Sequence, residues 1–241
     1  MFISDSVADV TSSDRGCESS SRKAGLEMEP VRPVPSVALG GTLKRCLDLI
    51  VALGALILLS PLFLLVTGAI KLTSTGPVFY GHKRVGFGGR TFRCWKFRSM
   101  ITDGDATLDA YLATRPDERL EWERNRKLKN DPRITRLGGV MREYSIDELP
   151  QLLNVILGDM SIVGPRPVVW HELAGYGTSI RHYLRTRPGI TGLWQVSGRS
   201  DVSFDQRVQL DTHYVTRWSL LLDCLIIFWT IPCVISAKGS Y

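Results

Sequence analysis

The chain has 241 residues, a net charge of +6 and an isoelectric point near 9.2. This length suits one domain with a sizeable core, and the positive charge favours an anionic partner such as a phospholipid surface, a nucleotide or a nucleic acid. The five cysteines are scattered, with no C-x-x-C pair and no histidine at metal-ligand spacing, which argues against a disulfide framework and a structural zinc site.

The N-terminal segment is rich in serine, proline and charge and holds few large apolar groups over residues 1 to 36. It lacks the basic region followed by an apolar stretch that a secretory signal requires. We expect a disordered tail over residues 1–40. The odd number of scattered cysteines fits a reducing, cytosol-facing location.

An apolar segment without a charge, LIVALGALILLSPLFLLVTGAI, covers residues 49 to 70. As a straight helix it would extend roughly 33 Å, which is enough to cross a bilayer once. Pro61 argues against a straight helix, because it lacks an N–H and its ring crowds the carbonyl of Ile57. We expect the helix to break at Ser60-Pro61, where Ser60 can satisfy freed backbone groups.

Cations flank this segment at both ends, with Lys44 and Arg45 before it and Lys71 after it. A positive-inside argument therefore assigns both ends to the cytoplasmic side. A helix that enters the bilayer, bends and returns to the same side agrees both with the predicted break and with the cations at both ends. The sequence thus predicts a re-entrant membrane helix over residues 41–74, with a single transmembrane span as the alternative.

Residues 78 to 100 predict a β-hairpin, with two short β-rich stretches around the turn signal Gly86-Phe87-Gly88-Gly89. A solvated face is the usual fate of such a run of cations, and a platform for phosphates is the alternative. Lys96 and Arg98 alternate on one strand face and are singled out as candidate substrate-binding residues. The six cations of the hairpin are Lys83, Arg84, Arg90, Arg93, Lys96 and Arg98.

Residues 105 to 129 look helical and polar, and they end at a turn over residues 130 to 132. We find no candidate chemistry in them. The sequence LGGVMREY that follows brings Arg142 shortly before two adjacent carboxylates, Asp147 and Glu148.

The two carboxylates stand in SIDE, where Ser145 and Glu148 match a capping box at the start of a helix that Gly158 can close. In that structural interpretation, both carboxylates only cap the helix and complement its dipole. Pro150 complicates it, because its ring would crowd the carbonyl of Ile146. We expect an irregular first turn or a later helix start, which leaves the carboxylates at a break and free to project.

Two further loops that carry arginine follow Asp147 and Glu148, the acidic dyad, in the sequence. Arg166 lies between two prolines in GPRP, and residues 185 to 199, RTRPGITGLWQVSGR, end at Arg199. Such a glycine-rich loop can bring backbone N–H groups and an arginine close to an anion. It can equally be a structural connection packed by Trp194.

A second apolar stretch runs from Trp218 to Ala237 and contains Asp223 and Pro232. A charge inside such a run is costly at bilayer depth. We expect a helix over residues 218–241 that lies in the membrane interface or against the domain. An ordinary buried helix is the alternative.

Together these motifs resemble the bacterial sugar transferase family, the monotopic phosphoglycosyl transferases that use a polyprenol phosphate. The resemblance covers about residues 41 to 241. It is carried by KRCLDLI, Ser60-Pro61, KFRSM, SIDELPQLLNV, GDMSIVGPRP, RPGITGLWQVSGR and the C-terminal apolar helix. Because residues 1 to 40 hold no apolar span, the chain resembles the short, exopolysaccharide-initiating form, which favours galactose or glucose as the sugar.

The resemblance implies transfer of a sugar 1-phosphate from a UDP-sugar to undecaprenyl phosphate, giving the lipid diphosphosugar and UMP. It implies that Asp147 is the nucleophile and a magnesium ligand, that Glu148 is its partner and that Mg²⁺ is the cofactor. The matching arginines for the phosphates or the nucleotide are Arg142, Arg166 and Arg199. A carboxylate that attacks a diphosphate needs such cations, because one anion approaches another.

The expected fold class is α+β, mostly helical with a small β-hairpin, a re-entrant membrane helix broken at Ser60-Pro61 and interfacial amphipathic helices. The cytoplasmic catalytic domain is expected over residues 75–217. The expected location is the bacterial inner membrane, with the domain facing the cytoplasm and with the lipid bilayer, but no nucleic acid, as a partner. Homo-oligomer formation stays open.

Two other functions compete with this one. A membrane-tethered basic module for lipid or nucleic acid would use the dyad only as a helix cap and would catalyse nothing. A glycosyltransferase that moves the sugar without its phosphate would release UDP. The nucleotide product separates all three.

Overall fold

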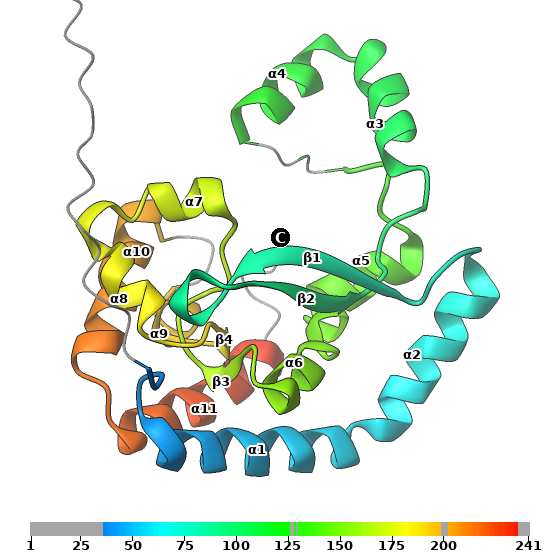
Figure 1. The fold of residues 1–241 in the computed structure, drawn as a ribbon. Helices are drawn as coiled ribbons and strands as arrows, with labels where there is room; N and C mark the ends of the chain where they lie inside the picture. Colours follow the sequence, from blue (N-terminus) through cyan, green and yellow to red (C-terminus); the bar gives the residue numbers. More distant parts are fainter. Residues whose placement is uncertain (1–35, 126–127, 129, 199–201, 236–241) are drawn as a thin grey trace, which may run out of the picture. The chain divides into compact units, whose positions relative to one another are not determined.

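The computed structural model describes residues 36–125, 128, 130–198 and 202–235, all within one unit, Pro33–Tyr241. The described residues are mostly helical with two small sheets, which confirms the predicted α+β class and its hairpin (Figure 1).

The helices are α1 (Gly41–Leu58), α2 (Ser60–Thr73), α3 (Gly104–Ala113), α4 (Pro116–Asn125), α5 (Arg136–Glu143), α6 (Gln151–Leu157), α7 (Trp170–Ala174), α8 (Ile180–Leu184), α9 (Leu193–Val196), α10 (Phe204–Thr216) and α11 (Leu220–Ile235). The short 3₁₀ turns are η1 (Phe87–Gly89), η2 (Ile146–Glu148) and η3 (Gly177–Ser179), and the strands are β1 (Phe79–Val85), β2 (Thr91–Phe97), β3 (Ser161–Val163) and β4 (Gly189–Thr191). Most of the predicted tail over residues 1–40, and residues 236–241 of the predicted C-terminal helix, lie outside the described part of the chain.

The apolar segment is a bent pair of helices, α1 and α2, with an angle of 61° between them. The break falls where it was predicted, because α2 begins at Ser60 with Pro61 in its first turn. The Ser60 hydroxyl donates a 2.8 Å hydrogen bond to the carbonyl of Ile57, the group that the proline ring leaves without its helical partner. Within the described ranges, no single helix is long and apolar enough to cross a membrane, whereas this bent pair passes that test together by length and composition.

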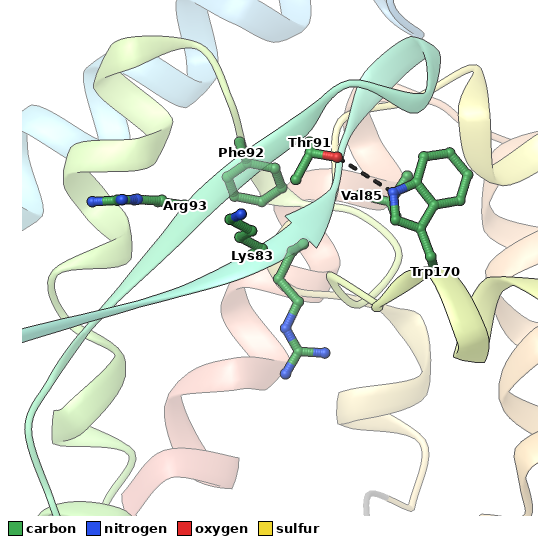
Figure 2. Close-up of a pocket in the computed structure, with 7 residues that line it drawn as sticks. Lys83, Val85, Thr91, Phe92, Arg93 and Trp170 are labelled. Carbon is green, nitrogen blue, oxygen red and sulfur yellow. Dashed lines mark hydrogen bonds between the residues drawn. The ribbon is translucent and has the colours of Figure 1, made fainter.

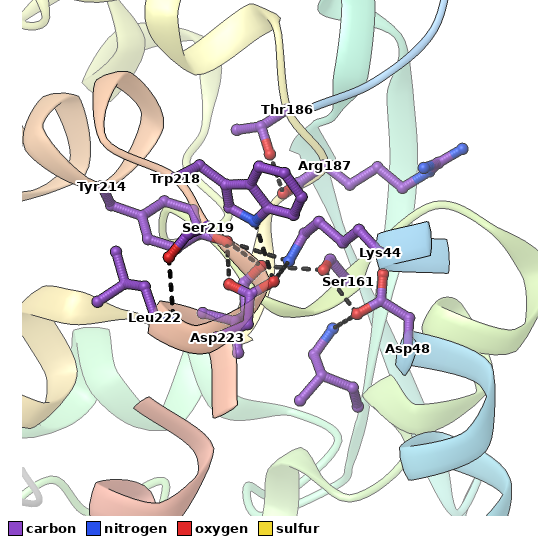
Figure 3. Close-up of polar contacts among 12 residues, drawn as sticks. Lys44, Asp48, Ser161, Thr186, Arg187, Tyr214, Trp218, Ser219, Leu222 and Asp223 are labelled. Atoms are coloured by element: carbon purple, nitrogen blue, oxygen red, sulfur yellow. Dashed lines mark hydrogen bonds and ion pairs between the residues drawn. The ribbon is translucent and has the colours of Figure 1, made fainter. Parts of the chain in front are cut away.

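Helix α1 turns two charged side chains inward. Its buried stripe is Lys44, Asp48 and Ala52, at four-residue spacing, while Ile50 and Ile57 on the other side are 71% and 75% exposed. Asp48 accepts hydrogen bonds from the Ser161 hydroxyl at 2.8 Å and from the backbone N–H of residue 162 at 2.9 Å (Figure 3). A surface helix of a water-soluble domain shows the opposite pattern.

Helix α11 repeats this inverted pattern. Asp223 and Ile226 are fully buried, and Thr230 bonds Thr191 of β4 at 2.7 Å, whereas Leu221 and Phe228 are largely exposed. The helix packs on α9, β3 and β4 and lies on the same side of the unit as α1 (Figure 1). The buried-helix alternative therefore describes its inner face, and the outer face remains apolar and uncovered.

The hairpin β1–β2 is antiparallel, and its register pairs Lys96 with Tyr80 and Arg93 with Lys83. Asn154 of α6, which is fully buried, holds β2 from one side: it accepts from the backbone N–H of Trp95 at 2.9 Å and donates to the carbonyl of Arg93 at 2.7 Å. Because side chains alternate along a strand, β2 presents Lys96 on the same face as the buried Cys94 and Phe92.

The short parallel pair β3–β4, which was not predicted, joins two of the sequence motifs. Gly164 of GPRP lies so close to Gly189 of the glycine-rich loop that a Cβ on Gly189 would come within 2.1 Å of the Gly164 nitrogen. Only glycine fits such a backbone approach. This contact fixes the segment that carries Arg166 against the segment that carries Trp194.

Candidate active site

Asp147 and Glu148 lie in η2, a single 3₁₀ turn between α5 and α6. The predicted capping box is wrong, because Ser145 adopts a left-handed conformation (φ 56°) and its side chain caps nothing. The effect expected of Pro150 is confirmed, since α6 begins only at Gln151. The two carboxylates therefore stand at a break between helices.

Lys96 of β2 bridges the two carboxylates. Its ammonium nitrogen lies 2.5 Å from Oε1 of Glu148 and 3.5 Å from Oδ2 of Asp147. The Asp147 side chain is 8% exposed, compared with 36% for Glu148 and 33% for Lys96. The hairpin and η2 thus bring together a buried carboxylate, a more accessible one and a cation, from segments about fifty residues apart in sequence.

The two carboxyl groups have different environments. Burial raises the pKa of Asp147, and Lys96 and Arg142 oppose this rise only in part. Burial also acts on Glu148, but Lys96, Arg166 and a hydrogen bond from Gln151 together hold its pKa below the usual value. Two neighbouring carboxyl groups with pKa values pushed in opposite directions are typical of sites that do acid, base or nucleophilic chemistry.

Lys96 stays charged in this site. Burial disfavours its ammonium form, but the two adjacent carboxylates more than offset this effect and raise its pKa. The site therefore holds a fixed cation against both carboxylates. A positive charge in this position suits a reaction in which negative charge accumulates beside the carboxylates.

The other predicted cations differ in their surroundings. Arg142 is exposed in the last turn of α5, where its charge favours ionised Asp147. Arg166 is exposed in the loop after β3, and its charge favours ionised Glu148. Both therefore contribute positive potential to the dyad. Their predicted role in binding the phosphates or the nucleotide stays a prediction.

The aromatic ring of Trp194, for which the sequence suggested only a packing role, positions the Arg166 side chain. Its guanidinium lies 5.7 Å from the centroid of the Trp194 ring, and that of Arg207 lies 4.8 Å from the same centroid. Arginine over an aromatic face gains electrostatic attraction and loses freedom. No sequence signal connected Arg207 of α10 to this site, because the contact depends on the tertiary fold.

Arg98 has different partners from Lys96. It follows the last residue of β2, and its guanidinium donates to the carbonyls of Ser74 and Thr75 at 3.1 Å and 2.6 Å, just after α2. Its predicted role in substrate binding stays a prediction. Arg199, predicted for the same role, lies outside the described residues.

Two buried polar residues of α6 support the dyad and were missed. Gln151, which is 2% exposed, hydrogen bonds Glu148, and Asn154 holds β2 in place. They stand three positions apart in a helix that is otherwise apolar, so they share a face. Two polar residues at this spacing in an apolar helix were the sequence signal that could have identified them.

Within the described part of the chain, no group of three or more histidine, cysteine, aspartate or glutamate side chains could hold a metal ion by itself. The dyad offers two carboxylates. Magnesium commonly takes one or two protein carboxylates and completes its shell with substrate phosphate oxygens and water. Asp147 and Glu148 fit an ion that arrives with a diphosphate.

The model of the family described as "Bacterial sugar transferase" matches residues 39–237. The chain is 54% identical over 215 residues to "Exopolysaccharide production protein ExoY" of Sinorhizobium fredii, which covers 89% of this chain and 93% of that protein. It is 49% identical over 200 residues to the "Undecaprenyl-phosphate galactose phosphotransferase" of Salmonella typhimurium, covering 83% of this chain and 42% of the relative. It is also 41% identical over 206 residues to the "UDP-glucose:undecaprenyl-phosphate glucose-1-phosphate transferase" of Xanthomonas campestris, covering 82% of this chain and 40% of the relative.

Proposed function

The chain belongs to the bacterial sugar transferase family, in its exopolysaccharide-initiating type, and from this we propose that it transfers a sugar 1-phosphate from a UDP-sugar to undecaprenyl phosphate. The products are undecaprenyl-diphospho-sugar and UMP. Two of the relatives named above act on galactose or glucose, so these two sugars are the first candidates for the donor. The reaction opens the assembly of an exopolysaccharide or a related glycan.

One observation carries this proposal: a buried carboxylate and an accessible carboxylate share one bridging ammonium group, Lys96. In the first displacement, an Asp147 carboxylate oxygen attacks the β-phosphorus of the donor. The bond from this phosphorus to the oxygen of UMP breaks, and UMP leaves. In the second displacement, an oxygen of undecaprenyl phosphate attacks the same phosphorus and releases the Asp147 carboxylate.

The cations of the site serve this chemistry. Lys96 favours the ionised, nucleophilic form of Asp147 against the effect of burial, and it stabilises the charge that accumulates on the transferred phosphoryl group. Arg142 adds positive potential at Asp147, and Arg166 adds it at Glu148. Glu148 keeps Lys96 charged and in place between the two carboxylates.

Magnesium fits this site as a shared ion. Asp147 and Glu148 would hold it together with the diphosphate oxygens of the donor, since the described side chains form no metal cluster of their own. When bound, it would supply further positive charge against the transferred phosphoryl group.

The lipid acceptor requires a membrane surface, and the inverted pattern of α1 and α11 supports one. Both helices turn charged side chains toward the domain and apolar side chains outward, which suits a helix that lies between protein and lipid. We assign residues 41–74 to a re-entrant membrane helix, residues 75–217 to a catalytic domain on the cytoplasmic side of the inner membrane and residues 218–241 to an interfacial helix. In this arrangement the dyad can meet the phosphate of a lipid whose chain stays in the bilayer.

The nucleotide product tests the proposal. The purified full chain, mixed with undecaprenyl phosphate in nanodiscs and a panel of UDP-sugars with Mg²⁺, should release UMP with one or two of these donors. Release of UDP would mean a transfer without the phosphate and would contradict the proposal. The absence of any nucleotide release with the whole panel would favour a basic binding module.

A further inference from the structure

Three of the six hairpin cations contact a polar partner elsewhere in the described chain. Lys96 binds the dyad, Arg98 binds the chain after α2, and Arg84 forms a 3.3 Å ion pair with Glu172. Lys83 and Arg93 have no ion pair within the described residues and are both exposed. The catalytic proposal uses neither of them.

Lys83 and Arg93 are direct cross-strand partners in the register of β1 and β2. Like charges placed opposite each other destabilise a two-stranded sheet. A surface that needs only solubility mixes positive and negative charge instead. An anionic ligand between the two side chains would remove the repulsion.

These two cations line a pocket of about 530 Å³, together with Arg84, Val85, Thr91, Phe92 and Trp170 (Figure 2). We call it the outer hairpin pocket. Its volume lies within the range of small-molecule sites. Trp170 forms one wall: its side chain is largely exposed, and its indole N–H donates to the Thr91 hydroxyl at 3.3 Å, which fixes the direction of the ring.

The outer hairpin pocket is separate from the dyad. Lys83 pairs with Arg93, and Val85 pairs with Thr91, so these four side chains share one face of the hairpin. Arg84 and Phe92, the other two hairpin residues of the pocket, pair with each other on the opposite face. Lys96, which binds the dyad, lies on the opposite face, because it is an odd number of residues from Arg93 along β2 and side chains alternate between the two faces. A ligand held between Lys83 and Arg93 would therefore lie across the sheet from the catalytic carboxylates.

The pocket also lies away from the apolar outer faces of α1 and α11. Helix α6 contacts α1 on one side and β2 on the other, so it separates α1 from the hairpin (Figure 1). The face of β2 that carries Arg93 is turned away from α6. A membrane-anchored headgroup is therefore a poor occupant, and a soluble anion is a better one.

From these observations we propose that the outer hairpin pocket binds a soluble nucleoside phosphate, with its phosphate between Lys83 and Arg93 and its base against Trp170. Arginine and lysine are the usual partners of phosphate oxygens. An exposed indole ring offers a stacking surface that accepts any base, because every base has a flat π face. The described lining offers little hydrogen bonding to a base edge, so base selectivity should be weak.

Binding of ADP to the full chain in detergent micelles, measured by isothermal titration calorimetry, tests the proposal. ADP avoids the uridine of the catalytic donor, and we expect one equivalent to bind. The double variant Lys83→Gln/Arg93→Gln should weaken this binding at least about tenfold, because two charge-assisted contacts are lost. Trp170→Leu should weaken it about five- to tenfold through lost stacking.

Two controls make the result specific. Arg90→Gln removes an exposed hairpin charge that does not line the pocket and should leave ADP affinity within about twofold. Lys96→Gln should also preserve ADP binding, and the Lys83→Gln/Arg93→Gln variant should still release UMP at the normal rate. Thermal melting checks that each variant is folded, and the single variants Lys83→Gln and Arg93→Gln replace the double variant if it does not fold.

Several results would overturn the proposal. The first is that the unaltered chain does not bind ADP. The second is that Arg90→Gln weakens ADP binding as much as the double variant does. The third is that Lys96→Gln no longer binds ADP. Inorganic phosphate that binds as tightly as ADP would contradict the stacked base. A hexaglutamate peptide that binds more tightly than ADP would indicate a protein partner instead.

Discussion

Lys44 of α1 and Asp223 of α11 form an ion pair across 179 positions of sequence, with 2.6 Å between Nζ and Oδ2. Their side chains are 4% and 0% exposed, and Tyr214 and Trp218 donate hydrogen bonds to the same carboxylate (Figure 3). The pair ties the two helices with apolar outer faces to each other. Lys44, which the positive-inside argument counted among the flanking cations, is therefore buried and paired with an opposite charge.

Loss of one partner of this pair should be costly. Asp223→Ala leaves the Lys44 ammonium buried without a counter-charge, so the free energy of unfolding should fall by about 3–5 kcal/mol. The double variant Lys44→Met/Asp223→Leu should recover most of this loss, because a buried pair can be replaced by apolar side chains of similar volume. Denaturant titration in detergent micelles measures both.

The matched control is Glu123→Ala, which breaks the exposed pair with Arg119 on α4. Exposed pairs contribute about 0–1 kcal/mol. If Asp223→Ala lowers the free energy of unfolding as little as the control does, the buried pair does not hold α1 and α11 together.

Asp147→Asn should abolish sugar-phosphate transfer while the chain stays folded. An amide cannot form the bond to phosphorus, so UMP release should fall to background, and no label should remain on the protein when a reaction with β-³²P-labelled donor is quenched. Asp109→Asn, an exposed aspartate of α3, is the control and should react normally. Label that is retained at another residue would remove Asp147 as the nucleophile.

The same substitution should also change how stability depends on pH. Because burial raises the folded-state pKa of Asp147, folding of the unaltered chain loses stability as the pH rises from the unfolded pKa through the folded pKa. This loss is absent in strong acid and grows as the pH rises. Asp147→Asn should therefore melt at a higher temperature than the unaltered chain at pH 7.5, with a difference that shrinks as the pH falls below the usual carboxyl range. A difference that is independent of pH would contradict the raised pKa.

The local features of the site could be predicted from the sequence, and the long-range ones could not. Pro61 and Pro150 act on their own turns of backbone, so the helix break and the late start of α6 followed from the sequence. Strand alternation grouped Lys96 with Arg98, but β2 ends before Arg98, and the partner of Arg98 in residues 74 and 75 depends on the tertiary fold.

The support of Arg166 is also a tertiary feature. It depends on contact between Gly164 and Gly189 and on two arginines that share the ring of Trp194. Each of these residues has an ordinary local context in the sequence. Their association appears only when β3 and β4 pair, and no local pattern carries that information.

Lys96→Ala should shift the pH dependence of transfer as well as its rate. Lys96 lowers the pKa of both Asp147 and Glu148, so its removal should raise both values. In the proposed mechanism Asp147 must be ionised to attack, so the acidic limb of the kcat profile should move to higher pH, and the maximal kcat should fall about a hundredfold. Arg90→Ala, which removes an exposed charge at the hairpin turn, should change neither the position of the acidic limb nor the maximal kcat. A Lys96→Ala profile that is lower but not displaced would mean that Lys96 does not tune the nucleophile.

If the bent pair α1–α2 is a re-entrant membrane helix, as proposed, it predicts from which side each of its ends can be labelled. Lys44 is buried against Asp223, so the test cysteine at the N-terminal end is better placed at Thr42, which is exposed, and the one at the C-terminal end at Lys71. In a background without the native cysteines, both should react with a membrane-impermeant maleimide in inverted inner-membrane vesicles and neither in intact spheroplasts, because a re-entrant helix keeps both ends on the cytoplasmic side. Pro61→Ala restores a backbone N–H and should favour a straighter helix, so it should reduce labelling at one of the two ends. Labelling of Thr42→Cys and Lys71→Cys from opposite sides in the unaltered Ser60-Pro61 background would show a single span and would contradict the re-entrant arrangement.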